Sequence, residues 1–370
     1  MAAAKVTNKK NSLPAGQSKQ GNLSEYMGTG DLFDQFNDFS GLSTIEDADR
    51  HKYINLLGLY DLIPKKVLTQ SKTDSVVTRV LKNRSHNITI EIKPAVFAGN
   101  KLVYPGVRED RVESALAYLA CHGRSEIDSD TDSIKVFFTL RKVQRVIKKV
   151  LKREYSVVQI REALTILNES QLNITPNNKD ASLAIKSTRL SALVIHTRKE
   201  FVSLHEAGDE TTCIAVFHPL FALDIQQGRY NLHDLEWQGS LKNDLAETLY
   251  KQLSAHWRQA SVEENYSFSA SRFLESTSLG LSTTNTGRNW ANVRKALIEL
   301  HDKDFITKPN EDIRYLYKDG SITRKIEDVI FDFYASTKLQ EMMIKSNVHK
   351  RLSKKKIKES SANRLAIDAV

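Results

Sequence analysis

The sequence predicts an α+β fold composed of two similarly built domains, each made of helices followed by a β-hairpin. The length of 370 residues fits two domains with tails. In each half, stretches with apolar residues at helical spacing precede short alternating segments that are joined by polar turns. No residue-level match between the halves is apparent, so the predicted repeat is one of architecture.

We expect four parts along the chain. Residues 1–50 form a disordered and partly acidic extension, because residues 22–49 contain acids but no Lys or Arg. The first domain is expected over 51–238 and the second over 239–338. Residues 339–370 are expected to form a flexible basic tail that suits phosphate contacts.

Within the first domain a strand is predicted at 88–92, where apolar and polar residues alternate. A helix starts near Glu109, and a strongly basic helix covers about 139–152. A third helix, over 156–168, follows the N-cap Ser156, which Gln159 completes as a capping box. A polar hairpin tip, the wing, is predicted at 176–180, with short strands at 172–174, 183–186, 192–198 and 213–217.

The second half repeats this order. A long helix spans about 241–257, a short helix lies near 270–275, and a third helix covers 288–300. Strands are predicted at 305–307 and 313–317, and a hairpin turn at Asp319-Gly320 precedes a further strand. Residues 329–333 are another apolar segment. Three helices followed by a hairpin is the winged-helix order, so we predict tandem winged-helix domains.

Composition narrows the classes of function. A formal net charge of +9 and a sequence pI near 9.2 favour a polyanionic partner, nucleic acid first, although many basic proteins bind nothing in particular. No stretch approaches the roughly 18 apolar residues of a membrane span. The two cysteines, Cys121 and Cys213, belong to no CxxC pair, which speaks against a zinc ribbon. We therefore expect a cytoplasmic protein without a membrane contact.

The sequence shows no catalytic pattern. It contains no P-loop motif and no HExxH or HxH pair, and no nucleophile stands beside a recognisable base. His218 and His233 lie in apolar surroundings and are expected to be structural. We expect a binding protein and not an enzyme, with no catalytic residues, cofactor or metal.

One predicted helix has a face suited to reading DNA. On helix 288–300, Arg288, Ala291, Asn292 and Lys295 fall opposite the apolar stripe. Arg pairs bidentately with guanine and Asn with adenine, while Ala contacts a thymine methyl group. The alternative is an ordinary amphipathic helix whose polar face is solvated.

The corresponding helix of the first domain, 156–168, turns Val158, Glu162 and Thr165 outward, and a carboxylate is unfavourable beside phosphates. This helix is therefore predicted to be a weaker base reader or a protein interface, so the first domain positions and the second specifies. The full set of predicted DNA-binding residues is Arg288, Asn289, Ala291, Asn292, Lys295 and Lys308 in the second domain, and Arg141, Arg145, Lys148, Lys149, Lys152, Gln159, Arg161, Lys179, Lys186 and Arg189 in the first.

Several segments in order resemble one known family. They are Tyr104 to Leu116 (YPGVREDRVESAL), Phe138 to Leu140 leading to Ile160 to Leu164, Val216 to Leu220 with Gly228-Arg-Tyr230, and Asn289 to Leu300. Together they cover roughly residues 88–335 and resemble the iteron-binding, two-winged-helix Rep-type replication initiators of bacterial plasmids.

The resemblance implies a function. Such initiators bind repeated origin sites (iterons) as monomers, promote melting of an adjacent AT-rich segment, and recruit the host helicase and initiator, so that they take part in copy control. As dimers, joined largely through the first domain, they repress their own gene. A winged-helix transcriptional regulator without a replication role is the alternative, and an enzyme that cuts or joins DNA is a third class.

The long N-terminal extension departs from the family. Within it, Asp31, Leu32 and Phe33 resemble the last three positions of the short peptide by which bacterial proteins bind the sliding clamp. The leading Gln-Leu of that peptide is missing, since Thr29-Gly30 stands there. The resemblance implies a clamp contact at these three residues, with that departure against it.

Overall fold

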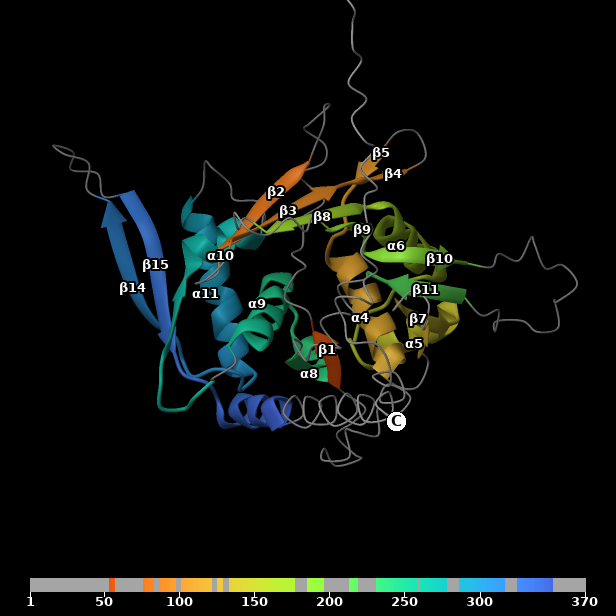
Figure 1. Cartoon of the computed structure of the whole chain (residues 1–370). Coiled ribbons are helices and arrows are strands. Elements are labelled where there is room, and N and C mark those ends of the chain that lie inside the picture. The colour runs from red at the N-terminus through yellow and green to blue at the C-terminus, as the bar shows by residue number, and fades with distance from the viewer. Residues whose placement is uncertain are drawn as a thin grey trace, which may run out of the picture.

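The computed structural model describes residues 53–56, 76–82, 87–97, 101–121, 125–128, 133–176, 185–195, 213–218, 231–257, 260–277, 286–316 and 325–348. Asp31, Leu32, Phe33, Lys179 and the basic residues beyond 348 lie outside these ranges. The described elements form helices and antiparallel sheets around a continuous apolar core (Figure 1).

The first unit comprises three mutually packed helices and a four-stranded antiparallel sheet. Its elements are α4 (Val107–Cys121), β6 (Ser125–Asp128), β7 (Ser133–Phe138), α5 (Leu140–Lys149), α6 (Val157–Glu169), β10 (Leu190–Val194) and β11 (Cys213–Phe217). The strands lie in the order β10-β11-β7-β6. The apolar stripes predicted from the sequence are buried, as Leu116, Ile147 and Leu164 show with no exposed surface.

The second unit comprises three helices and a three-stranded sheet. Its elements are α9 (Asp244–His256), β13 (Tyr266–Ser269), α10 (Ala270–Thr277), α11 (Thr286–Asp302), β14 (Asn310–Leu316) and β15 (Lys325–Phe333). The strands lie in the order β13-β15-β14, and α11 packs along α9. The aromatic residues Trp257, Tyr266 and Phe333 stack between the strands and α9, with ring centroids 4.9 to 5.8 Å apart.

The two units share part of their connectivity. In each, a helix leads to a strand, two helices follow, and a pair of antiparallel strands closes the unit. The first unit has an additional strand, β6, before β7, and β8 (Gln171–Pro176) and β9 (Ile185–Thr188) lie between α6 and its closing strands. In each sheet the closing strand lies between the strand that precedes the helix pair and its own hairpin partner, since β11 lies between β7 and β10, and β15 lies between β13 and β14. The first sheet also has β6 at its edge, beside β7. The predicted mixture of helices and antiparallel sheets is confirmed, and in both units two successive helices precede a closing pair of antiparallel strands.

A second four-stranded sheet interrupts the first unit. It consists of β2 (Val77–Lys82), β3 (Asn87–Lys93), β8 (Gln171–Pro176) and β9 (Ile185–Thr188), in that order, while β4 (Ala95–Phe97) pairs with β5 (Lys101–Val103). Strand β8 pairs along its whole length with β3, so that Ile174 stands opposite Ile90. The strands on either side of the predicted wing tip, β8 and β9, therefore belong to this sheet, whereas the hairpin that closes the first unit is β10–β11. Residues 177–180 lie outside the described ranges.

The connection between the units packs on the second unit. Strand β12 (Asn231–Asp234) pairs with β1 (Tyr53–Leu56) and leads into α8 (Leu235–Ser240). The Trp237 ring lies 4.8 Å from the Phe305 ring, and the Tyr250 hydroxyl donates to the carbonyl of Asp234 at 3.1 Å. The expected boundary at 238/239 therefore divides a segment, residues 231–240, that shares the core of the second unit.

Gly239 marks where this connection touches the first unit. A Cβ atom on Gly239 would lie 2.3 Å from the Val150 carbonyl oxygen at the end of α5, which no side chain permits. The backbones of α8 and α5 thus meet directly. The guanidinium of Arg153 completes this contact by donating to the Leu241 carbonyl.

Caps explain where several helices begin. The predicted capping box is confirmed, since Ser156 and Gln159 each bond the backbone N–H of the other. Helix α9 starts at Asp244 and not near 241, because Asn243 caps it and Leu241 instead ends α8. Residues 305–307 form one isolated bridge, Ile306 to Ala335, and no strand.

The segment expected as a tail starts with a packed helix. Residues 337–348 are helical, and the Ser336 hydroxyl accepts the N–H of Leu339 at 3.1 Å. Leu339, Met342 and Met343 are buried at the spacing of one helical face. The tail predicted from 339 is therefore structured at least to residue 348.

Candidate nucleic-acid interface

Helix α11 presents an exposed row of polar side chains. Arg288, Asn292 and Lys295 are exposed and Ala291 is half-buried, while Trp290, Val293, Leu297 and Leu300 on the other side are buried. Ile298, 44% exposed, extends the row by one turn, and the sequence analysis did not single it out. The row combines strong hydrogen-bond donors with apolar groups, which is the chemistry that reads base edges.

Two contacts hold α11 in place. Arg294 on α11 forms an ion pair with Glu311 on β14. Near the other end, Glu299 accepts the backbone N–H groups of Lys242 and Asn243, the latter at 3.1 Å. The helix that carries the row is therefore fixed both to its own sheet and to the start of α9.

The start of α11 is open on one side. A Cβ built on the exposed Gly287 meets no atom within 4 Å, so the backbone there is accessible to a large partner. Asn289 differs from its neighbours, because it is only 8% exposed and turns toward the interior. Of the residues predicted on this helix, the structure brings Arg288, Ala291, Asn292 and Lys295 together and sets Asn289 apart.

Lys308 is exposed but lies at the other end of α11. The chain turns back after the helix, where Phe305 donates to the Leu300 carbonyl at 2.9 Å, and Lys308 stands just before β14. From Arg288 to Leu300 the helix rises by roughly 18 Å. Lys308 therefore does not share the surface around Arg288.

Helix α5 carries a separate basic row. Val143, Val146 and Ile147 are buried, and the exposed side carries Arg141, Arg145, Lys148 and Lys149. Lys152, also exposed, follows beyond the end of the helix. Glu154 pairs with Lys148 at 2.7 Å, which raises the pKa of Lys148 and lowers that of Glu154. The row is long, one-sided and positively charged, which suits contacts with a phosphate backbone.

Helix α6 has a mixed outer face. Gln159 and Arg161 are exposed, and Val158 is 62% exposed. Glu162, the acid expected to weaken this face, accepts from the Arg108 guanidinium at 3.0 Å. The ion pair offsets the negative charge of Glu162. Arg108 on α4 therefore adds positive charge to this face, which the sequence alone did not indicate.

Lys186 and Arg189 lie in different environments. Lys186 is exposed on β9, whereas Arg189 is 3% exposed and pairs with Glu113 at 2.7 Å. Burial raises the pKa of Glu113, and the positive charge of Arg189 opposes this. Arg189 thus joins α4 to the start of β10 inside the first unit and does not reach the surface as a phosphate contact would.

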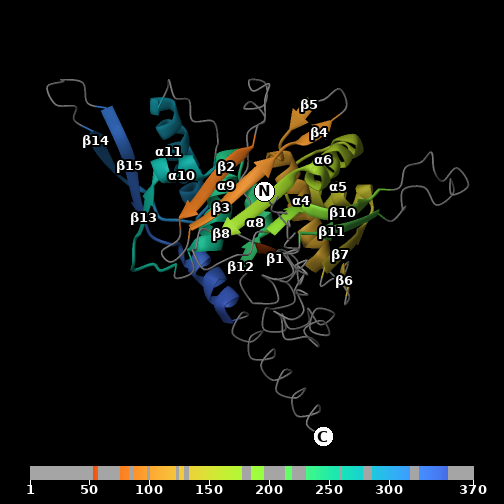
Figure 2. The ribbon, with the colours of Figure 1, turned by 45° about the horizontal axis from the view of Figure 1, so that its top comes forward.

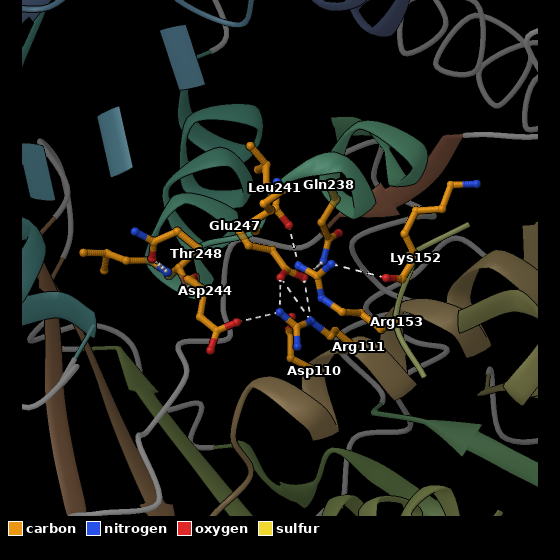
Figure 3. A network of polar contacts seen from close by, with 12 residues as sticks. Asp110, Arg111, Lys152, Arg153, Gln238, Leu241, Asp244, Glu247 and Thr248 are labelled. Carbon is orange, nitrogen blue, oxygen red and sulfur yellow. Dashed lines mark hydrogen bonds and ion pairs between the residues drawn. The ribbon is translucent and has the colours of Figure 1, made fainter. Parts of the chain in front are cut away.

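A buried polar network, which we call the seam, links α4 of the first unit to α9 of the second (Figure 3). The Arg111 guanidinium, 7% exposed, donates to Glu247 at 2.5 to 3.2 Å and to Asp244 at 2.6 Å. Lys251 pairs with Asp110 alongside. Burial alone lowers the pKa of Arg111, but its bonds to Glu247 and Tyr155 raise it above its ordinary value.

The seam continues into the connection between the units. Gln238 donates to Glu247 and accepts at 2.8 Å from the ring of the fully buried His233. Burial and then the charge of Lys251 lower the pKa of His233 to about 3. Burial and Arg189 likewise lower the pKa of His218 to about 4. Both histidines are neutral and embedded in the fold.

The two candidate reading helices stand on either side of one sheet. In both views the sheet β2-β3-β8-β9 extends between α10 and α11 on one side and α6 on the other (Figures 1 and 2). The hairpins β10–β11 and β14–β15 lie at opposite sides of the molecule. The arrangement places one helix-and-hairpin pair in each half.

Two searches of the described residues bear on other classes of site. None of the described helices has the length and apolar character needed to cross a bilayer. Within the same ranges, no group of three or more His, Cys, Asp or Glu side chains is placed to hold a metal ion.

Comparison with known proteins gives a distant likeness in structure. No family model matches the sequence, and no curated protein does. A solved structure of domains 2 and 3 of RctB is similar with a TM-score of 0.42 and 11% identity, over 74% of this chain and 96% of that one. The Pi initiator protein in complex with iteron DNA is similar with a TM-score of 0.40 and 14% identity, over 63% of this chain and 92% of that one.

Proposed function

We propose that this chain is a sequence-specific DNA-binding protein with two winged-helix units, and that it is a replication initiator that binds iterons in a plasmid origin. The observation that carries the proposal is the exposed row on α11, the second of two successive helices that precede a closing pair of antiparallel strands, an arrangement present in both units. In such units the helix before the hairpin enters the major groove. Here that helix is α11 in the second unit and α6 in the first.

The two units have different roles in this proposal. Arg288, Asn292 and Lys295 on α11 contact base edges, with Ala291 and Ile298 against thymine methyl groups. The row on α5 contacts phosphates and sets the position of the first unit. Helix α6, whose acid is paired with Arg108, reads fewer bases than α11.

The replication role rests on the family resemblance of the sequence. It includes melting beside the repeats, recruitment of host helicase and initiator, copy control, and repression of its own gene by a dimer. A contact with the sliding clamp through Asp31, Leu32 and Phe33 belongs to the same proposal. The protein binds and does not catalyse, and it needs no cofactor.

A footprint on the DNA that flanks the gene for this protein tests the proposal. Protection of several evenly spaced direct repeats, one helical turn or a multiple apart, is the expected result. A single protected inverted repeat over the promoter would instead identify a transcriptional regulator, and no discrete protection would overturn both. Incubating origin plasmid with Mg²⁺ or Mn²⁺ is the control for the third class, because nicking would reveal an enzyme.

A further inference from the structure

We propose that the seam fixes the relative position of α6 and α11, which makes Arg111 and Glu247 determinants of the spacing between the two halves of the DNA site. Neither residue reaches the proposed DNA-binding surface. The inference rests on the proposed function, since spacing has meaning only if both helices contact one site. It assigns a positioning role to residues that do not themselves contact bases.

Arg111 connects both units at one point. Its Nε and Nη2 donate to Glu247 on α9, while its Nη1 donates to the Tyr155 hydroxyl at 3.0 Å. Tyr155 immediately precedes the N-cap of α6. A guanidinium is planar with donors in fixed directions, so bonds on several of its sides set an orientation as well as a distance.

The connection extends from α9 to α11. Glu299 on α11 accepts the N–H groups of Lys242 and Asn243, the two residues before α9. A path of polar contacts therefore runs from the start of α6 through Arg111 and Glu247 to α9, and from there to α11.

Further contacts oppose sliding and rotation of the units. Lys251 on α9 pairs with Asp110 and donates to Ser114 at 2.9 Å, both on α4. At the other side of the junction, Gly239 lies directly against the backbone of Val150. Hydrogen bonds and ion pairs are directional, so a shift of one unit breaks several of them together, whereas an apolar contact tolerates a slide.

The spacing of a DNA site is sensitive to such rigidity. Each added base pair moves the second half of the site by about 3.4 Å and rotates it by roughly 35° about the duplex axis. Two reading helices on a rigid body engage both halves at one separation only. Helices on a loose tether accept several separations, with a lower affinity at the best one.

The experiment measures binding against spacing with the full chain. Sites are first selected from random DNA by the wild-type protein, and the separation of their halves is then changed by one and two base pairs. For the wild type, a two-base-pair change is expected to weaken binding about 100-fold, because the second contact is lost. For Arg111→Met with Glu247→Leu, the same change is expected to cost less than about 5-fold.

The double variant removes both charges because a lone buried charge would destabilise the fold. Thermal unfolding and circular dichroism verify that it folds. A second variant, Lys251→Gln with Asp110→Asn, weakens the seam at a less buried pair and is expected to broaden the spacing profile in the same direction. The control, Ser267→Ala with Asp332→Asn, removes a 2.6 Å hydrogen bond within the second unit and is expected to keep the wild-type profile.

The outcomes separate this inference from the proposed function. Folded seam variants that still reject altered spacings would overturn the positioning role while leaving the DNA-binding role intact. If the wild type selects no sequence, or a site with a single half, the two-helix function itself fails and the inference with it. A broadened profile in both seam variants, with unchanged base preference in each half, would establish the positioning role.

Discussion

Among single residues, Arg288 is the one whose replacement tests the recognition of bases most directly. It lies at the start of α11, exposed, one turn from Asn292. We expect Arg288→Ala to cost about 1–3 kcal/mol on the selected site and to relax the preference at one base pair. Competition binding against the site with each base pair substituted measures both effects.

The control for Arg288 is Lys303→Ala, an exposed basic residue beyond the far end of α11. It removes one positive charge without touching the row, so base preference is expected to stay unchanged. If Arg288→Ala instead weakens all sequences equally, the side chain contacts phosphate, and the base-reading residues lie elsewhere on the row.

The buried ring of His233 predicts how the stability of the protein depends on pH. Its folded-state pKa of about 3 lies below the value of 6.5 in the unfolded chain, because the ring is fully buried. Below pH 6.5 the His233 ring binds a proton in the unfolded state but stays neutral in the folded state. The contribution of the neutral, buried ring to stability is therefore fully present above pH 6.5 and is lost as the pH falls toward 3.

Comparison with His233→Gln isolates this contribution. The difference in the free energy of unfolding between wild type and variant is expected to shrink by about 1.4 kcal/mol per pH unit between pH 6 and 4. Urea unfolding at several pH values measures it. His218 and Glu113 titrate in both proteins and cancel in the difference, so a constant gap would show that the His233 ring reaches water.

Among elements, the end of α11 is strained at one residue. Asp304 has φ 59°, and the bonds from Asp304 to the His301 carbonyl and from Phe305 to the Leu300 carbonyl form a Schellman motif. Glycine adopts this backbone without a steric cost, so Asp304→Gly is expected to stabilise the protein by about 1 kcal/mol. Thermal unfolding would show the gain.

Asp302→Gly is the matched control for that change. It places the same glycine two residues earlier, within α11, where it is expected to destabilise by about 0.5–1 kcal/mol. Equal effects of both substitutions would mean that loss of an acid at this helix end, and not relief of the backbone, decides the stability.

Elements also show what the sequence alone can predict. The helices α5, α6, α10 and α11 follow from apolar spacing and caps, because local contacts determine them. The partner of β8 does not, since Ile174 lies opposite Ile90 across some eighty intervening residues, and a short apolar segment fits many partners. The same limit concealed Arg108, whose role depends on Glu162 from another helix.

Candidate residues divide in the same way. The exposed row on α11 follows from periodicity, as does the row on α5. Arg189 looked equivalent in sequence, but it is buried because Glu113, far away in the chain, neutralises it. Periodicity shows which side of a helix is polar, whereas pairing across the fold decides whether a charge remains at the surface.

For the whole molecule, the positive charge on α5 predicts how strongly DNA binding depends on the salt concentration. Arg145 and Lys149 are exposed on the same side of this helix. We expect replacing both with Gln to weaken binding to all sequences alike and to reduce the slope of log K against log salt by roughly 1.8. Binding at several salt concentrations measures the slope.

The matched control removes two charges elsewhere. Lys242 and Lys303 are exposed near the C-terminal end of α11, away from the two rows, and their replacement with Gln is expected to leave the slope unchanged. An equal reduction in both double variants would indicate a diffuse effect of net charge. No reduction for Arg145 and Lys149 would place the first unit's phosphate contacts on other residues.

The pairing of β1 with β12 has a consequence for synthesis of the chain. Tyr53 stands opposite Asp234, so the two partners are about 180 residues apart along the chain, and loops of that length close slowly. On the ribosome, β1 emerges long before β12. Until β12 follows, β1 and the face of α4 against which it packs lack this partner strand. The β1–β12 pair therefore forms only when the connection between the units emerges, and a nascent chain that stalls before that point would present an open edge to chaperones.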